Sequence, residues 1–141
     1  MRDGKVFPCP ICLPQGTQIA TPSGPVPVEG IRAGAVVWSL DEAARRVAVP
    51  VLIVGSTPVI DHQIVKIRLG DGRTVSASAG HPDRSGRPLG SLVAGDRLDG
   101  EAIVETVVVP YRGERTYDLL PGGVTGIYFA DGVPLASTLH R

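Results

Sequence analysis

The stretch that decides the fold runs from Cys12 to Gly24 and reads CLPQGTQIATPSG. Its apolar and polar residues alternate over Gln18 to Thr21, which is typical of a short strand, and Thr-Pro-Ser-Gly then marks a tight turn. An extended segment resumes at Val26 to Val28. The pattern predicts two short strands joined by a turn, with a cysteine at the entrance to the first.

The composition favours an all-β domain. The chain has 141 residues, which is about one domain, and it is rich in turn formers, with 18 Gly and 13 Pro. Only 20% of its residues are charged. Short Val-rich segments between Gly and Pro residues indicate many strands joined by tight turns. We expect the later strands at 36–40, 47–54, 62–69, 74–78, 103–109 and 115–120.

An internal repeat divides the chain into two halves. Residues 27–37, PVEGIRAGAVV before the first long strand, return as the related segment 88–98 at a constant offset of 61. Pro, Ala and Gly recur identically, and apolar residues recur at matching positions. A duplicated unit predicts two β-rich halves about a pseudo-twofold axis that bury a shared core.

The charge pattern argues against several classes of partner. Lys plus Arg and Asp plus Glu both number 14, and the longest basic run is Arg45-Arg46, so we expect no nucleic-acid partner. The longest apolar run, Val47 to Gly55, is well below the ~20 residues that a membrane span needs. The first residues also lack a signal-peptide pattern. We expect a soluble monomer, and the sequence does not indicate its compartment.

A second polar cluster follows the predicted strand 74–78. The segment Ser78-Ala79-Gly80-His81-Pro82 places Ser78 and His81 where Gly80 and Pro82 turn the backbone. Side chains at a strand end can face a cleft while the sheet holds their backbone. Histidine titrates near neutral pH, which makes His81 a candidate acid or base.

These motifs together resemble the Hint domain, the self-processing module shared by inteins, bacterial intein-like domains and hedgehog proteins. The opening Cys12 segment, the Ser-x-x-His cluster and the closing strand Arg115 to Leu120 all match family motifs. The hairpin sequence Tyr-Phe-Ala-Asp-Gly-Val, 128–133, matches the closing hairpin motif of the family. Asp131 stands where the family has Asn, a harmless change in a turn. The resemblance covers Cys12 to about Leu135 and implies a horseshoe-shaped, pseudo-symmetric all-β fold.

The resemblance implies a reaction at the Ile11-Cys12 peptide bond. The Cys12 thiol would attack the preceding carbonyl and convert the amide into a thioester, with nucleophile and target held in one backbone. His81 would protonate the departing amine, and Ser78, where the family usually has Thr, would donate a hydrogen bond to the scissile carbonyl. Asp118, in the Tyr-Asp-Leu strand, would assist the thiol or hold a proton. No cofactor is required.

The end of the chain departs from a splicing intein. Splicing needs a terminal His-Asn pair, and counting from the hairpin places Ala136 and Ser137 there, followed by Thr138. A serine side chain cannot form the succinimide that releases a downstream segment. We therefore expect N-terminal processing alone, with the acyl group of Met1 to Ile11 passing to water or to an external nucleophile. The alternative is an inert Hint fold that serves as a structural or interaction module.

The domain bounds follow from the same motifs. Residues 1–11 form a leader that is the domain's own substrate, 12–137 form the Hint domain, and 138–141 form a tail. His62 and His140 belong to no motif, so we expect both to be solvated.

The pair Cys9 and Cys12 has three interpretations. It could bind zinc together with His81 or His140, although the spacing does not support a full ligand set. It could form a disulfide that withholds the nucleophilic sulfur under oxidising conditions. The simplest interpretation is that Cys9 is incidental.

Overall fold

The computed structural model describes residues 12–140. Apart from two single turns of 3-10 helix, η1 (Val28–Gly30) and η2 (Leu89–Ser91), its regular structure there is all strand. The predicted all-β class is confirmed. The strands are β1 (Leu13–Pro14), β2 (Gln18–Ile19), β3 (Val26–Pro27), β4 (Val36–Leu40), β5 (Arg46–Pro58), β6 (Gln63–Leu69), β7 (Thr74–Ala77), β8 (Arg97–Leu98), β9 (Glu101–Pro110), β10 (Arg115–Pro121), β11 (Ile127–Ala130) and β12 (Val133–Ala136).

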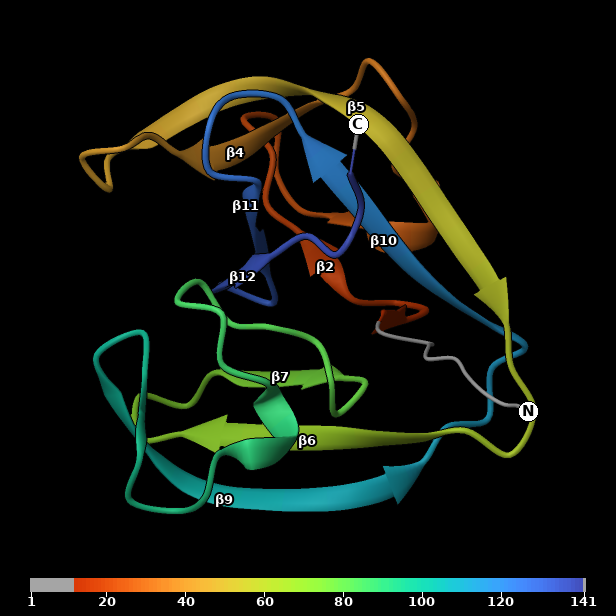
Figure 1. Cartoon of the computed structure of the whole chain (residues 1–141), viewed down its shortest axis with the longest axis vertical. Coiled ribbons are helices and arrows are strands. Elements are labelled where there is room, and N and C mark those ends of the chain that lie inside the picture. Colours follow the sequence, from red (N-terminus) through yellow and green to blue (C-terminus); the bar gives the residue numbers. More distant parts are fainter. Residues whose placement is uncertain (1–11, 141) are drawn as a thin grey trace.

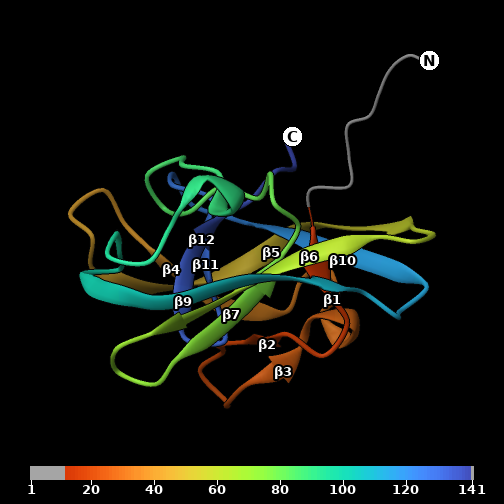
Figure 2. The same cartoon turned by 90° about the horizontal axis from the view of Figure 1, so that it is seen from below.

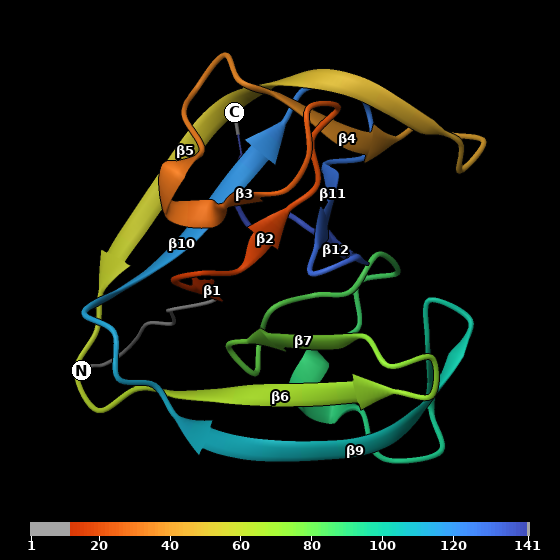
Figure 3. The ribbon, with the colours of Figure 1, turned by 180° about the vertical axis from the view of Figure 1, so that it is seen from behind.

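Three four-stranded sheets organise the described residues. Their strand orders are β1-β10-β5-β4, β12-β11-β2-β3 and β7-β6-β9-β8. Figure 1 shows the first two sheets curling together into one lobe, while β6, β7 and β9 form a second lobe beside it. Figure 2 views the molecule from below, onto the second lobe, and Figure 3 shows from behind that β1 lies between the lobes.

The predicted repeat is visible in the backbone. Both 3-10 turns follow a proline, Pro27 in one half and Pro88 in the other, and they keep the offset of 61 residues. Each turn leads through a Gly-containing loop to a short strand and then to a long one, β5 or β9. The two halves are therefore copies of one structural unit, as the sequence predicts.

Strand β5 is longer than its sequence pattern predicts. We expect it to end near Val54, before Gly55 and Pro58, but it continues to Pro58. Its first part pairs with β4, and its second part pairs with β10, from Val51 opposite Pro121 to Pro58 opposite Arg115. A partner strand from the end of the chain supplies the hydrogen bonds that extend β5, and local propensity cannot foresee that pairing.

The core fills the space between the lobes with aliphatic side chains. Its largest fully buried side chain is Tyr128, which carries a hydroxyl into the interior. The polar residues Ser78, His81 and Asp118 are buried as well, with exposed fractions of 2% or less. Buried polar groups are costly unless they are hydrogen-bonded, so their partners are the first guide to function.

A tight backbone contact holds the loop that carries Ser78 and His81. Gly90, in η2, donates its N–H to the carbonyl of Ala79 at 2.8 Å. A Cβ atom on Gly90 would lie 2.7 Å from the Ala79 Cβ, so a glycine is needed for this approach. The loop therefore packs directly on the 3-10 turn of its own half.

No helix within residues 12–140 is long and apolar enough to cross a membrane.

Candidate active site

Cys12 lies at the entrance to β1, between the two lobes. The antiparallel register of β1 and β10 pairs Leu13 with Tyr117, and one further step of that register brings Cys12 opposite Asp118. The side chain of Cys12 is buried, with 6% exposed. The fold therefore brings the predicted nucleophile and the predicted acid of β10 to the same place.

Ser78 contacts the backbone of Cys12 through three hydrogen bonds. The Ser78 N–H donates to the Cys12 carbonyl at 3.0 Å. The Ser78 hydroxyl donates to the same carbonyl at 3.1 Å and accepts from the Cys12 N–H at 3.3 Å. That Cys12 nitrogen belongs to the Ile11-Cys12 peptide bond. The carbonyl that we expect Ser78 to contact belongs to Ile11, which lies outside the described residues, as does Cys9.

His62 is a site residue that sequence reasoning missed. Its Nε2 lies 2.9 Å from the Ser78 hydroxyl oxygen, and the side chain is half-buried, so His62 is less solvated than we expect from the sequence. Burial lowers the pKa of His62 below its ordinary value. His140, by contrast, is exposed as predicted.

The pairing of β6 with β7 indicates that His62 lies near Ser78. Strands β6 and β7 pair with Val65 opposite Ala77, a register that continues to Ile64 opposite Ser78. His62 is then the diagonal neighbour of Ser78 on the same face, two residues beyond its partner. The Gly70 to Arg73 hairpin turn sets this register, so the contact could have been found from the turn.

His81 is held by its backbone and by the side chain of Tyr128. Its N–H donates to the Ser78 carbonyl at 3.0 Å, and its own carbonyl accepts from the N–H of Leu89 at 2.9 Å. Its ring is fully buried, and Nε2 lies 3.0 Å from the hydroxyl of Tyr128. The two rings meet edge to face, with their centroids 6.2 Å apart.

Tyr128 joins His81 to Asp118. The Tyr128 hydroxyl donates its single hydrogen to Oδ1 of Asp118 at 2.7 Å, so its oxygen must accept from His81 Nε2. His81 therefore carries a hydrogen on Nε2. Burial, followed by the charge of Asp118, raises the pKa of Tyr128 well above its ordinary value and keeps the phenol protonated.

Asp118 is surrounded by hydrogen-bond donors. Besides Tyr128, its carboxylate accepts from its neighbour's N–H, that of Leu119, at 2.8 Å and from the Thr138 N–H at 2.9 Å. The Thr138 hydroxyl donates to it as well. A carboxylate with this many donors is rigidly oriented and fixes the Tyr128 hydroxyl in turn.

Two hydrogen-bonded networks thus lie on either side of Cys12. We call the first, which comprises His62, Ser78 and the Cys12 backbone, the His62 network. We call the second, which comprises His81, Tyr128, Asp118 and Thr138, the His81 network. Their link is the turn from Ser78 to His81. A Coulomb interaction with Cys12 also contributes to the raised pKa of Tyr128, which places the cysteine within electrostatic reach of the His81 network.

The four residues predicted from the sequence, Cys12, Ser78, His81 and Asp118, are brought together by the fold. Tyr128 and Thr138 join them, although the sequence marked them only as a strand residue and a tail residue. The described residues, 12–140, hold no group of three or more His, Cys, Asp or Glu side chains that could bind a metal ion.

Comparisons with known proteins agree with this architecture. Residues 11–66 match the family model described as the Hint domain. The chain also superimposes on the Ssp DnaB mini-intein variant M86, with a TM-score of 0.80 and 17% sequence identity over 96% of this chain and 100% of the other. The chain has the Hint fold of inteins and intein-like domains.

Other solved structures share the fold. The bacterial intein-like domain from Clostridium thermocellum gives a TM-score of 0.77 at 21% identity, over 92% of this Hint domain and all of the other chain. The gp41-1 intein gives a TM-score of 0.69 at 22% identity, over 91% and 99% of the two chains. A comparison with curated protein sequences gave no match.

The closing hairpin of the Hint domain tolerates its unusual residue. Asp131 adopts a left-handed conformation with φ of 49° between β11 and β12, a turn position where Asp and Asn both fit. Its Oδ1 accepts the N–H of Gln18 at 2.9 Å and so ties the hairpin to β2. The exchange of Asn for Asp preserves this contact, because either side chain offers an oxygen.

Proposed function

We propose that this Hint domain cleaves the peptide bond before Cys12 through a thioester and passes the N-terminal segment to water or to an external nucleophile, without splicing. The observation that carries the proposal is the hydrogen bond between the Cys12 amide nitrogen and Ser78, beside a buried His81 of defined tautomer. In this reaction Cys12 supplies the nucleophile and the leaving nitrogen, and His81 supplies the base.

The chemistry is a shift of one acyl group from nitrogen to sulfur. The Cys12 sulfur bonds to the Ile11 carbonyl carbon, and the bond from that carbon to the Cys12 nitrogen breaks. One proton moves from the thiol to the departing nitrogen, and Nδ1 of His81 is the group that would carry it. General acid-base help of this kind contributes roughly 10² to 10⁴ in rate. Asp118 would act through Tyr128 by holding the His81 ring in its reactive tautomer.

The C-terminal residues support processing at the N-terminal side alone. Strand β12 ends at Ala136, and Ser137 and Thr138 follow it, so no asparagine stands where splicing would require one. Thr138 instead supplies two donors to Asp118. A serine or threonine side chain lacks the amide nitrogen that succinimide formation needs.

Intact-mass spectrometry of the full chain tests the proposal. The chain is purified under reducing conditions and incubated with and without hydroxylamine, a strong nucleophile that captures thioesters. We expect the mass to fall by that of Met1 to Ile11, faster with hydroxylamine, and we expect Cys12→Ala to abolish the loss.

Two outcomes would decide against the proposal. A full-length mass that persists under strong nucleophile would leave an inert Hint fold whose purpose lies in what it binds. Cleavage that continues in the Cys12→Ala variant would point to a contaminating protease instead of a thioester.

A further inference from the structure

We propose that the imidazole of His62 sets the direction of the Ser78 hydroxyl at the Cys12 backbone, and that protonated His62 keeps the Ser78 hydrogen on the Cys12 carbonyl. His62 would then be a positioning residue that makes cleavage faster under mildly acidic conditions. The inference rests on the thioester reaction proposed above and adds a residue that controls it.

The argument begins with the hydrogens that Ser78 has available. Its hydroxyl has one hydrogen to donate but lies within hydrogen-bond distance of three groups: the Cys12 carbonyl at 3.1 Å, the Cys12 nitrogen at 3.3 Å and Nε2 of His62 at 2.9 Å. One donor hydrogen cannot serve all three. Whether Nε2 of His62 carries a hydrogen therefore decides where the Ser78 hydrogen points, and the protonated ring always carries one.

Neutral His62 with a bare Nε2 accepts the Ser78 hydrogen. The Ser78 oxygen is then left to accept the Cys12 N–H, a contact that stabilises the intact amide. Protonated His62 carries a hydrogen on both ring nitrogens and can only donate to Ser78. The Ser78 hydrogen then points at the Cys12 backbone.

This second arrangement favours the reaction. The Ser78 hydrogen then lies on the Cys12 carbonyl, and the Ser78 oxygen accepts from both His62 and the Cys12 N–H. An oxygen that already accepts from a cation is a weaker acceptor, so the contact that stabilises the intact amide weakens. Weakening a contact of the ground state lowers the barrier to breaking the Ile11-Cys12 bond.

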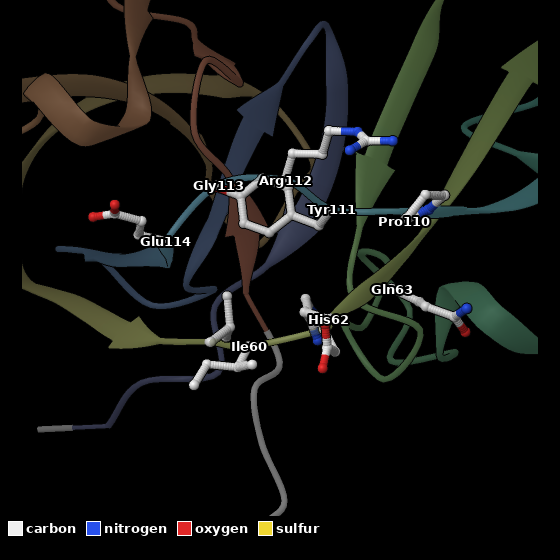
Figure 4. Close-up of a pocket in the computed structure, with 10 residues that line it drawn as sticks. Ile60, His62, Gln63, Pro110, Tyr111, Arg112, Gly113 and Glu114 are labelled. Carbon is white, nitrogen blue, oxygen red and sulfur yellow. The ribbon is translucent and has the colours of Figure 1, made fainter.

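A pocket gives His62 access to solvent protons. A cavity of about 580 Å³ lies between the segments 59–63 and 110–114, and His62 forms part of its wall. Figure 4 shows His62 and Tyr111 reaching this pocket from the two segments. Their rings meet edge to face, with centroids 6.3 Å apart. Cleavage can therefore respond to the pH of the medium even though Ser78 is buried.

The charged groups around the pocket are mixed in sign. Asp61 lies on the segment of His62, while Arg112 and Glu114 face it from the opposite segment. Tyr111 is engaged, since its hydroxyl accepts from the N–H of Gln15 at 2.9 Å and donates to the carbonyl of Arg115 at 2.6 Å. Burial lowers the pKa of His62, so we expect its protonation on the acidic side of the ordinary histidine value of about 6.5.

The experiment compares cleavage rates of the full chain between pH 5 and pH 8, under hydroxylamine, by intact mass. His62→Leu removes the contact with Ser78, and His62→Gln keeps a hydrogen-bonding group that does not titrate. The ratio of the parent rate to the His62→Leu rate cancels pH effects that both share. We expect that ratio to be about tenfold at the acidic end and to fall toward one as His62 loses its proton. His62→Gln should restore part of the rate without the acid-dependent gain.

The matched control is His140→Leu, which removes an exposed histidine and should leave the rate and its pH profile unchanged. A ratio that stays constant with pH, or a His62→Leu rate equal to that of the parent, would overturn the inference while leaving the proposed function intact. If the parent itself does not react, the proposed function has failed instead.

A second measurement does not depend on cleavage. In the unreactive Cys12→Ala chain, the ¹⁵N shift of His62 Nε2 is followed by NMR with Ser78 present and with Ser78→Ala added. We expect the substitution to change the Nε2 shift and the titration midpoint of His62. Identical titrations in the two proteins would show that the hydrogen bond does not form in solution and would overturn the inference.

Discussion

The two hydrogen-bonded networks beside Cys12 differ in their access to water. The His81 network is buried: His81 is fully buried, and Tyr128 and Asp118 are buried with it. The His62 network begins at a half-buried imidazole in a pocket wall and reaches inward through Ser78. One network is thus protected from the medium, and the other is connected to it.

The difference separates two tasks that a single histidine could not combine. A buried histidine whose Nε2 hydrogen is directed at Tyr128 has a defined tautomer, which suits a proton carrier. A histidine that shares a pocket with solvent can change its protonation with the pH of the medium. Substitutions in the two networks should therefore differ in size and in pH dependence.

The largest effect is expected from His81→Gln. Glutamine can still hydrogen-bond to the Tyr128 hydroxyl, so the fold should survive, but it cannot carry a proton. We expect the cleavage rate under hydroxylamine to fall by about 10² to 10⁴. Intact mass measures the rate. The control is His140→Gln, the same substitution at an exposed histidine. An unchanged rate would remove His81 from the mechanism.

Ser78→Ala should have the second-largest effect on the cleavage rate. It removes the one hydroxyl that joins His62 to the Cys12 nitrogen, and the loss of a single donor of this kind costs about 10² to 10³ in rate. The measurement is the same time course at several pH values, because the acid-dependent gain should vanish together with the rate. Ser91→Ala, which removes an exposed hydroxyl bonded to Pro88, serves as the control. A variant that kept the pH profile of the parent would separate Ser78 from His62.

Tyr128→Phe should have a smaller effect on rate and a clear effect on stability. It deletes the hydroxyl that bridges His81 and Asp118 and leaves buried polar atoms on both sides. We expect a loss of about 1 to 3 kcal/mol in the free energy of unfolding and a rate about tenfold lower, because the His81 tautomer is no longer imposed.

Urea unfolding and the cleavage time course measure the two effects of Tyr128→Phe separately. Tyr117→Phe, on strand β10, is the control for loss of a tyrosine hydroxyl outside the network. Equal stability of the Tyr128→Phe variant and the parent would mean that the bridge contributes nothing to the fold.

The smallest effect on rate is expected from Asp83→Asn, which acts through the loop that follows His81. Burial alone would raise the pKa of Asp83, but hydrogen bonds from Ser85 and Arg87 outweigh it, so the pKa is lowered. A lowered pKa in the folded state adds stability above the ordinary Asp value of about 3.9, and that stability disappears as the pH falls through the folded-state pKa.

Asp83→Asn should accordingly be less stable than the parent at pH 7 by about 1 to 3 kcal/mol. The difference should shrink in acid, below about pH 4. Urea unfolding at neutral and acidic pH measures it, and Glu42→Gln is an exposed carboxylate control. A difference that did not change with pH would show that the charge of Asp83 is not what stabilises the loop.

The sequence predicts the scaffold well because the relevant signals are local. The alternation of residues, the turn chemistry and the repeat at an offset of 61 lead to an all-β fold of two halves, and the 3-10 turns after Pro27 and Pro88 reproduce that offset. The four predicted site residues were found through motifs that stand at strand entrances and strand ends. Signals of this kind depend on neighbours in the sequence, so one sequence is enough to see them.

The partners of those residues depend on contacts between distant segments. Tyr128 is an ordinary strand residue until β11 packs beside β10 and the second half supplies His81. His62 has no motif, and its role follows only from the register of β6 with β7. The same long-range pairing extends β5 beyond its local pattern.

What the sequence by itself determined is therefore the fold class, the repeat and the identity of the residues that could do chemistry. The tertiary structure alone decided which nitrogen of His81 carries the hydrogen, and which side chain forms a hydrogen bond with the Ser78 hydroxyl. The physical reason is that side-chain type and backbone propensity are properties of single residues and their neighbours. A tautomer or a buried hydrogen bond is set by groups that meet only when distant strands pack together.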